Sequence, residues 1–174
     1  DLIYGSQGVN HYDGGEGKGD RVQYEDAAGV TVDMNDPLSG TGSAYGDTFV
    51  NIERIQGGAG NDTIRLAADT TGYGKGGNDT IVDSDGREIM RGDAGADIFV
   101  FTSRDGESDI IRDYEAGIDT IDLQGWQTSW DDLEITGGDD GRAYVSVQGD
   151  TLIVNDAWDT EAQTHLLDKD DFLF

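Results

Sequence analysis

Apolar residues recur at nearly fixed intervals between Gly57 and Phe101. This stretch divides into the units GGAGNDTIR, LAADTTGY, GKGGNDTIV, DSDGREIMR and GDAGADIFV, of which only the second is shorter than nine residues. The nine-residue units share early glycines, an acid at the sixth place and an apolar residue at the eighth. The acids are Asp62, Asp79, Glu88 and Asp97, and the apolar residues are Ile64, Ile81, Met90 and Phe99.

This repeat predicts an all-β fold, a parallel β-roll. Six glycine-rich residues form a tight turn, because glycine readily adopts positive φ. The next three residues form a short strand with its middle side chain pointing inward, and two units make a coil of about eighteen residues. Asp79 and Asp97 are eighteen positions apart, so they should stack on one edge of the roll. Glu88 should lie on the opposite edge.

The repeat is also present at the start of the chain. Residues 1–23 read as a weaker block, with Asn10 and Asp20 at the acid place. Together with the block at 57–101, this predicts a roll over residues 1–101.

Residues 24–56 interrupt the repeat and are predicted to be a non-repeat insertion. Apolar and polar residues alternate over 30–34, which indicates a strand. The repeat returns briefly at 42–50, with Asp47 at the acid place, and residues 51–56 are predicted to form a further strand.

Residues 102–174 are predicted to form a C-terminal cap, because an open last coil would leave an unpaired strand edge. Residues 109–114 and 117–123 alternate apolar and acidic side chains, which is typical of antiparallel strands. Residues 143–147 and 151–154 are predicted to form a hairpin joined by Gln-Gly-Asp.

Aromatic residues indicate a small core within this cap. Trp126 and Trp130, with Leu133, are predicted to be buried there, and Trp158 likewise, rather than to form a platform for sugars. Residues 162–171 are predicted to form at most a short helical turn.

Charge explains why such a chain needs a ligand. The 37 acidic and 11 basic residues give a net charge of -26, and a free chain of this composition repels itself. Divalent cations would offset the charge. Stacked carboxylates and turn carbonyls form an all-oxygen site, which favours calcium over magnesium.

Several other function classes are excluded. Binding to nucleic acid or to anionic membranes needs clustered Lys and Arg. The chain has no cysteine, and no apolar run near the repeats is long enough to span a membrane. His11 and His165 are too far apart in sequence to suggest a zinc site, and both are expected to be exposed. HExxH, GxSxG and a cysteine nucleophile are missing, so the chain is not expected to be an enzyme itself.

The motifs resemble a known family of calcium-binding repeats. GGAGNDTI at 57–64 matches the consensus of RTX proteins at every defined place. AGVTVD at 28–33 and GDTFVNIE at 46–53 resemble segments between the RTX blocks of secreted hemolysin-type proteins. DYEAGIDTIDL at 113–123 resembles the cap of serralysin C-terminal domains, and the final DFLF resembles the ending of proteins exported by type I secretion.

This resemblance implies several calcium ions, each held by turn carbonyls and sixth-place acids of successive coils. Lys75 and Asp93 depart from the pattern because they replace the second glycine, and the unit at 66–73 has no clear ligand set. Glu88 could be either a ligand or a solvated acid at a turn. The implied ligands are Gly57, Gly58, Gly60, Asp62, Gly74, Gly76, Gly77, Asp79, Glu88, Gly92, Gly95 and Asp97, with Asn10 and Asp20 in the weaker block. Asp109, Asp113 and Asp119 would hold another ion in the cap.

The resemblance also implies a function. The chain would be a monomeric module that is disordered at low calcium, passes through the type I secretion machinery of a bacterium and folds in extracellular calcium. Asp1 falls in mid-repeat, so the module is expected to be part of a larger secreted protein. The alternative is a polysaccharide-binding module, for alginate for example, or an adhesin module. An acidic surface opposes this alternative unless calcium or the basic residues Arg87, Arg91, Arg104 and Arg112 bridge the two.

Overall fold

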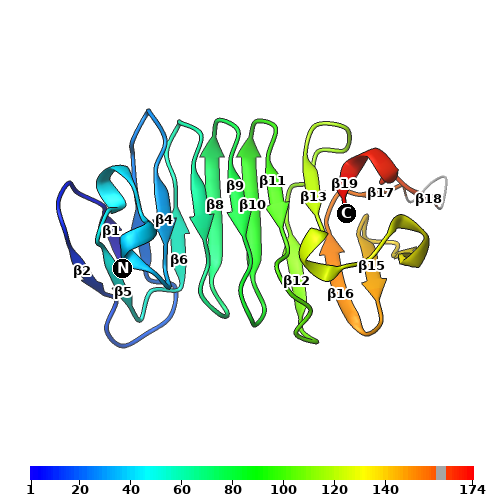
Figure 1. Ribbon diagram of the computed structural model, residues 1–174, viewed down its shortest axis with the longest axis horizontal. Helices are drawn as coiled ribbons and strands as arrows, with labels where there is room; N and C mark the ends of the chain where they lie inside the picture. Colours follow the sequence, from blue (N-terminus) through cyan, green and yellow to red (C-terminus); the bar gives the residue numbers. More distant parts are fainter. Residues whose placement is uncertain (160–163) are drawn as a thin grey trace.

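Two parallel sheets run along the long axis of the molecule and enclose a narrow apolar core (Figure 1). The computed structural model describes residues 1–159 and 164–174. In the first sheet the parallel strands follow one another in space as β1 (Leu2–Tyr4), β3 (Arg21–Gln23), β6 (Arg54–Gln56), β8 (Thr71–Gly76), β10 (Ile89–Ala94), β12 (Ser108–Ile111) and β16 (Asp150–Val154).

The second sheet is built from the strands that alternate with these along the roll. In spatial order they are β4 (Thr31–Asp33), β7 (Thr63–Arg65), β9 (Thr80–Val82), β11 (Ile98–Val100), β13 (Thr120–Asp122) and β19 (Phe172–Leu173). A separate parallel pair, β2 (His11–Asp13) and β5 (Thr48–Val50), lies at the N-terminal end. The predicted all-β parallel roll is therefore confirmed.

The middle residues of the short strands form the centre of the core. Ile64, Ile81, Phe99 and Ile121 are direct cross-strand partners, and all four are fully buried. This is the eighth-place pattern of the sequence, because every second side chain of a strand points to the same face.

The eight-residue unit at 66–73 fills its place in the core differently. Gly72 takes the inner position of β8, in register with Ile55 and Met90. A Cβ at Gly72 would lie 3.0 Å from Ile81 and 3.2 Å from Leu66. Leu66 is completely buried, so it occupies the space that an eighth-place side chain would otherwise fill.

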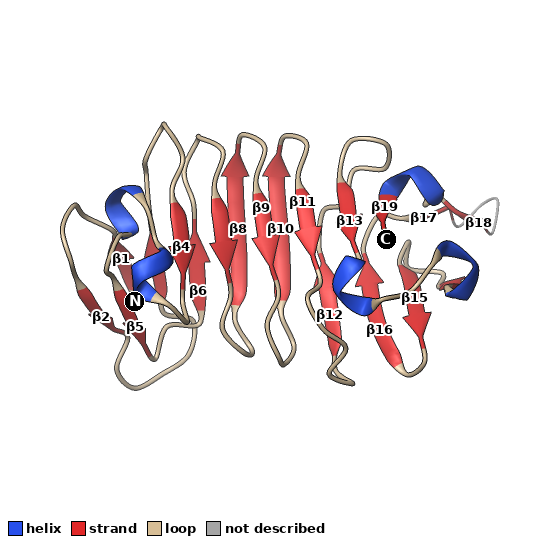
Figure 2. Ribbon diagram, in the orientation of Figure 1, coloured by secondary structure: helices blue, strands red, loops and turns tan. Residues whose placement is uncertain are grey.

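The region 24–56 contributes strands to both sheets and carries two short 3-10 helices, η1 (Pro37–Ser39) and η2 (Gly42–Ala44) (Figure 2). Strand β4 pairs with β7, and β6 pairs with β3 and β8.

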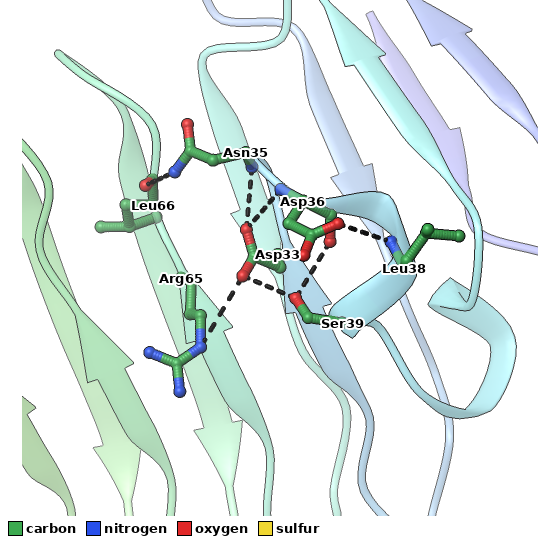
Figure 3. A network of polar contacts seen from close by, with 7 residues as sticks. All are labelled: Asp33, Asn35, Asp36, Leu38, Ser39, Arg65 and Leu66. Carbon is green, nitrogen blue, oxygen red and sulfur yellow. Dashed lines mark hydrogen bonds and ion pairs between the residues drawn. The ribbon is translucent and has the colours of Figure 1, made fainter.

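Asp33, at the end of β4, fastens the loop that holds η1 (Figure 3). Its carboxylate accepts the N–H groups of Asn35 and Asp36 at 2.9 and 2.8 Å and the hydroxyl of Ser39 at 2.7 Å. The amide of Asn35 in turn donates to the carbonyl of Leu66 at 2.8 Å, which ties the loop to the next coil.

The C-terminal end is antiparallel. Strands β14 (Glu134–Gly137), β15 (Ala143–Val147) and β16 pair antiparallel, which confirms the predicted hairpin. Residues 109–123 were expected to form antiparallel strands, and this is wrong: β12 pairs parallel with β10 and β16, and β13 with β11 and β19. These strands continue the coils past residue 101, with Ile111 and Ile121 in the buried inner places.

Aromatic side chains fill the end of the roll, as predicted. Trp126, in η3 (Gln124–Trp126), is buried with its ring centroid 5.9 Å from that of Phe101. Trp130 begins η4 (Trp130–Asp132) and packs on Phe172 with ring centroids 5.6 Å apart, but Trp130 and Leu133 are only half-buried against the core rather than fully buried. The side chain of Trp158 lies outside the described residues.

The chain after the hairpin is described only in part. It holds β17 (Trp158–Asp159), β18 (Thr164–His165) and the 3-10 turn η5 (Lys169–Asp171). The N-terminal part of the turn expected at 162–171 and the side chain of His165 fall outside the described residues, whereas His11 is exposed as expected. No helix in the described part of the chain is long and apolar enough to cross a membrane.

Candidate metal centre

Four aspartates stack along one edge of the roll. The Oδ1 atom of each accepts a backbone N–H from the preceding coil. Val30 donates to Asp62 at 2.7 Å, Asp62 to Asp79 at 2.7 Å, Asp79 to Asp97 at 2.8 Å and Asp97 to Asp119 at 3.0 Å. This set is called the aspartate edge below, and it confirms the stacking that the eighteen-residue spacing predicts.

The second carboxylate oxygens along this edge have different surroundings. Asp62 Oδ2 accepts the N–H of Gly58 at 2.6 Å, and Asp119 Oδ2 accepts the N–H of Glu115 at 2.8 Å. Asp79 is only 1% exposed, and its Oδ2 has no hydrogen-bond partner. Leaving a buried carboxylate oxygen unpaired is costly, so this oxygen fits a bound cation.

Glycines allow main-chain oxygens to approach this edge. A Cβ at Gly74 would lie 2.1 Å from Asp79 Oδ2 and 2.8 Å from the carbonyl oxygen of Gly92. At Gly57 it would lie 2.0 Å from Asp62 Oδ2 and 2.9 Å from the carbonyl oxygen of Gly74. Carboxylate and carbonyl oxygens of successive coils thus converge where a side chain would otherwise stand, and this is a donor set suited to calcium.

The opposite edge carries a second acidic ladder. Glu88 is fully buried, which rules out the alternative of a solvated acid at a turn. Its carboxylate accepts the N–H groups of Asp69 at 2.9 Å and Ser84 at 3.1 Å, and its own N–H donates to Asp109 at 2.9 Å. Asp20, nearer the N-terminus, is also buried on this side, where its N–H donates to Glu53 at 2.9 Å.

The structure places Asp109 apart from Asp113 and Asp119, the other two acids expected to share an ion in the cap. Asp109 lies beside Glu88, whereas Asp119 belongs to the aspartate edge. Asp113 accepts the N–H of Asp93 at 2.8 Å and pairs with Arg91 at 3.2 Å. Among the described residues, no three acidic or histidine side chains converge on one point. Any ion here would therefore depend on backbone carbonyls as well as carboxylates.

Burial makes the ionised form of these acids unfavourable. It raises the pKa of Asp79 to about 7 and that of Asp97 to about 6, and negative charges on neighbouring coils act in the same direction. On the opposite edge, burial raises the pKa values of Glu88 and Asp109 to about 7. A bound cation would offset both the cost of burying these carboxylates and the repulsion between their charges.

Two asparagines, Asn61 and Asn78, form a ladder that sequence reasoning missed. Asn61 Oδ1 accepts the N–H of Asn78 at 2.8 Å, and Asn78 Oδ1 accepts the N–H of Ala96 at 3.1 Å. Asparagine recurs at the fifth place of the units that begin at Gly57 and Gly74, and this recurrence is the sequence signal that indicates the ladder.

Other buried acids were also missed. Asp83 accepts the N–H and the hydroxyl of Thr102 at 2.8 and 2.7 Å, and no spacing in the sequence distinguishes it. Asp47 is buried in the coil next to Asn10; its sixth place in the brief repeat at 42–50 was recognised, but it was not predicted to be a site residue.

The sequence matches the model of a known protein family. Residues 38–150, well over half of the chain, match the family model described as the peptidase M10 serralysin C-terminal domain. No curated protein sequence gives a significant match.

Proposed function

The chain belongs to the peptidase M10 serralysin C-terminal family, and we propose that it is a calcium-binding module that folds only when calcium is present. The matched family is that of the non-catalytic C-terminal domain. On this proposal, the module is disordered inside the bacterial cell, is exported by type I secretion, and folds outside to stabilise the larger secreted protein that carries it.

The observation that carries the proposal is the orphaned oxygen of Asp79. A fully folded, ion-free roll would hold this oxygen buried without a donor, among the like charges of Asp62 and Asp97. The carbonyl of Gly92 supplies a further oxygen nearby, as the carbonyl of Gly74 does beside Asp62. Calcium, when bound, supplies positive charge that these oxygens can share.

The proposed ligands follow the two edges. Turn carbonyls and carboxylates of the aspartate edge hold one row of ions, and Glu88 with Asp109 contributes to sites on the opposite edge. Asp20 is a further candidate on that side, and Asp113 with Asp119 continues the first row toward the cap. The ligands of the first row are drawn from Gly57, Gly58, Gly60, Asp62, Gly74, Gly76, Gly77, Asp79, Gly92, Gly95 and Asp97.

Binding and folding are coupled in this proposal. The two ladders exist only when distant coils are stacked, so the sites are absent from the unfolded chain, and binding energy becomes folding energy. Extracellular modules bind calcium with dissociation constants of roughly 10⁻⁴–10⁻³ M. Such affinities leave the chain unfolded at the low calcium of a cell interior, which suits passage through a narrow exporter.

Substitution of Asp79 tests the proposal. Asp79→Asn keeps the hydrogen bond from Asp62 but removes the charge. The calcium concentration at the folding midpoint should therefore rise at least tenfold. Asp131→Asn is the control, because it removes the same charge from an exposed position in the cap. Equal midpoints for the two variants, measured by calcium titration, would contradict the role given to Asp79.

A specific surface favours a second function, the binding of an acidic polysaccharide. On the outer face of the first sheet, Gln23, Gln56, Tyr73 and Arg91 are cross-strand partners in successive strands. Arg21 and Arg54 form a neighbouring pair in the next row. The guanidinium of Arg21 lies 5.5 Å from the ring centroid of Tyr73 and donates to Gln56 at 2.7 Å.

The residues of these rows are arginine, amide and aromatic groups, on a chain of net charge -26. Arg91 at the end of the row is paired with Asp93 and Asp113, so Arg21 and Arg54 are the cations that this surface offers to a carboxylate. Arginine binds carboxylates, and aromatic rings pack against sugars. Calorimetry with alginate oligomers at fixed free calcium tests the idea. The test variant is Arg21→Gln/Arg54→Gln, and the control is Arg65→Gln, which lies on the other sheet. We expect the double variant alone to lose at least tenfold in affinity. Absence of heat with the wild-type chain would leave the folding module as the sole proposal.

A further inference from the structure

The first coil, which contains Asn10, is built differently from the middle coils. Asn10 stands at the sixth place, where the well-formed units have aspartate. Its side-chain nitrogen Nδ2 donates to the carbonyl oxygen of Ser6 at 2.9 Å, to that of Gly8 at 2.9 Å and to Asp47 Oδ1 at 3.1 Å. Two turn carbonyls and one carboxylate of the neighbouring coil thus converge on one nitrogen.

These three oxygens are of the same kinds that the middle coils offer to a cation. The orientation of the amide follows from them, because reversing it would place Asn10 Oδ1 against three other oxygens. The amide oxygen instead accepts the hydroxyl of Ser6 at 3.3 Å. An NH₂ group therefore occupies the point at which an ion would have to sit.

Asp47 is engaged by three hydrogen-bond donors of the protein, one of which is the Asn10 side-chain NH₂ group. Its Oδ1 also accepts the backbone N–H of Asn10 at 2.7 Å, and its Oδ2 accepts the hydroxyl of Tyr24 at 2.7 Å. Asp47 and Tyr24 are both buried. Asp79 occupies the corresponding place in a middle coil, yet its Oδ2 has no donor. The difference lies in the protein donors that surround the two carboxylates.

We propose that the Asn10 amide, assisted by the Tyr24 hydroxyl, takes the place of a calcium ion and closes the first coil without metal. The inference rests on the proposed calcium role of the middle coils. It divides the roll into a metal-independent first coil and later coils that depend on calcium. Matching the repeat pattern would then not suffice for ion binding.

Counting the bound ions by native mass spectrometry of the whole chain in calcium tests this division. Asn10→Ala should bind the same number of ions as the wild type, since Asn10 is not a ligand. Asn10→Asp should bind one ion more, because it replaces the amide donors with acceptor oxygens. Gln7→Glu is the matched control: it adds the same charge to the same turn at an exposed position and should leave the number unchanged.

Each outcome decides between alternatives. Loss of one ion in Asn10→Ala would show that Asn10 is a ligand and overturn the inference. An unchanged number in Asn10→Asp, or an equal gain in Gln7→Glu, would overturn it as well. If Asn10→Ala does not fold, as judged by circular dichroism, the Asn10→Asp count decides alone. A wild-type chain that binds no calcium would contradict the proposed function instead, and the gain in Asn10→Asp would still test the inference.

Discussion

At the scale of single residues, the surroundings of each acid distinguish sites that look alike in sequence. Asp47, Asp62 and Asp79 all occupy the sixth place of a repeat unit. Tyr24 satisfies the second oxygen of Asp47, and Gly58 that of Asp62, whereas that of Asp79 has no donor. The repeat predicts where acids stack. It does not predict which of their oxygens remain free, because a donor can come from a residue outside the repeat unit, as Tyr24 does for Asp47.

Backbone strain at Lys75 gives a prediction at the same scale. Lys75 stands where the consensus has glycine, and it adopts a φ of +91° that side chains rarely take. Lys75→Gly should therefore stabilise the calcium-loaded fold by about 1 kcal/mol, since a non-glycine residue pays roughly that much in this region. Urea unfolding at saturating calcium measures the change.

Arg65→Gly provides the control for this substitution. Arg65 is exposed in β7, where its φ is not in the positive region, so glycine there should destabilise the fold by roughly 0.5–1 kcal/mol. If Lys75→Gly lost stability as Arg65→Gly does, the result would contradict the conclusion that the backbone is strained at Lys75.

The raised pKa values predict how the calcium-free chain responds to pH. The pKa of Asp79 rises from 3.8 to about 7 on folding, and that of Glu88 from 4.5 to about 7. Protonation therefore favours the folded state: this contribution is complete below pH 4 and is lost as the pH rises through about 7. In chelator, acidification from pH 8 to pH 5 should increase β structure, and with calcium it should weaken ion binding.

Circular dichroism across this pH range, with and without chelator, provides the measurement. A calcium-free chain that gains no β structure between pH 8 and pH 5 would contradict the assignment of buried, uncompensated acids.

At the scale of elements, local patterns predicted strands well but not always their partners. Residues 109–123 alternate as an antiparallel pair would, yet β12 and β13 join different parallel sheets. Alternation reports that a strand has one buried face, and it does not report the direction of its neighbours. The eight-residue unit at 66–73 stays in register with its neighbouring coils because Leu66 fills the space in the core that Gly72 leaves open.

The loop fastened by Asp33 should respond as one element. Asp33→Ala removes the acceptor for two N–H groups and the hydroxyl of Ser39, which should cost about 1 kcal/mol. Hydrogen exchange should then accelerate over residues 34–46 and remain unchanged in the coils from Gly57 onward. Asp131→Ala is the exposed control. Uniform acceleration along the whole chain would show that Asp33 supports the roll in general rather than this loop.

At the scale of the whole molecule, the sequence predicted the parallel roll, its antiparallel end and its stacked acids. The roll and its stacked acids follow from the period of the repeat, which fixes which residues lie above one another, whereas the antiparallel hairpin follows from two short strand patterns and the Gln-Gly-Asp turn between them. The hydrogen bonds of Asn10 and Tyr24 with Asp47 could not be predicted, because they join segments that share no motif. A net charge of -26 on a narrow roll with buried acids gives the central claim: calcium is what permits this chain to fold.

Far-ultraviolet circular dichroism of the wild-type chain tests this claim most directly. The spectrum should be that of a disordered chain in chelator at pH 8 and become rich in β structure at millimolar calcium, with magnesium at the same concentration having little effect. A β-rich spectrum in chelator that calcium leaves unchanged would contradict the account.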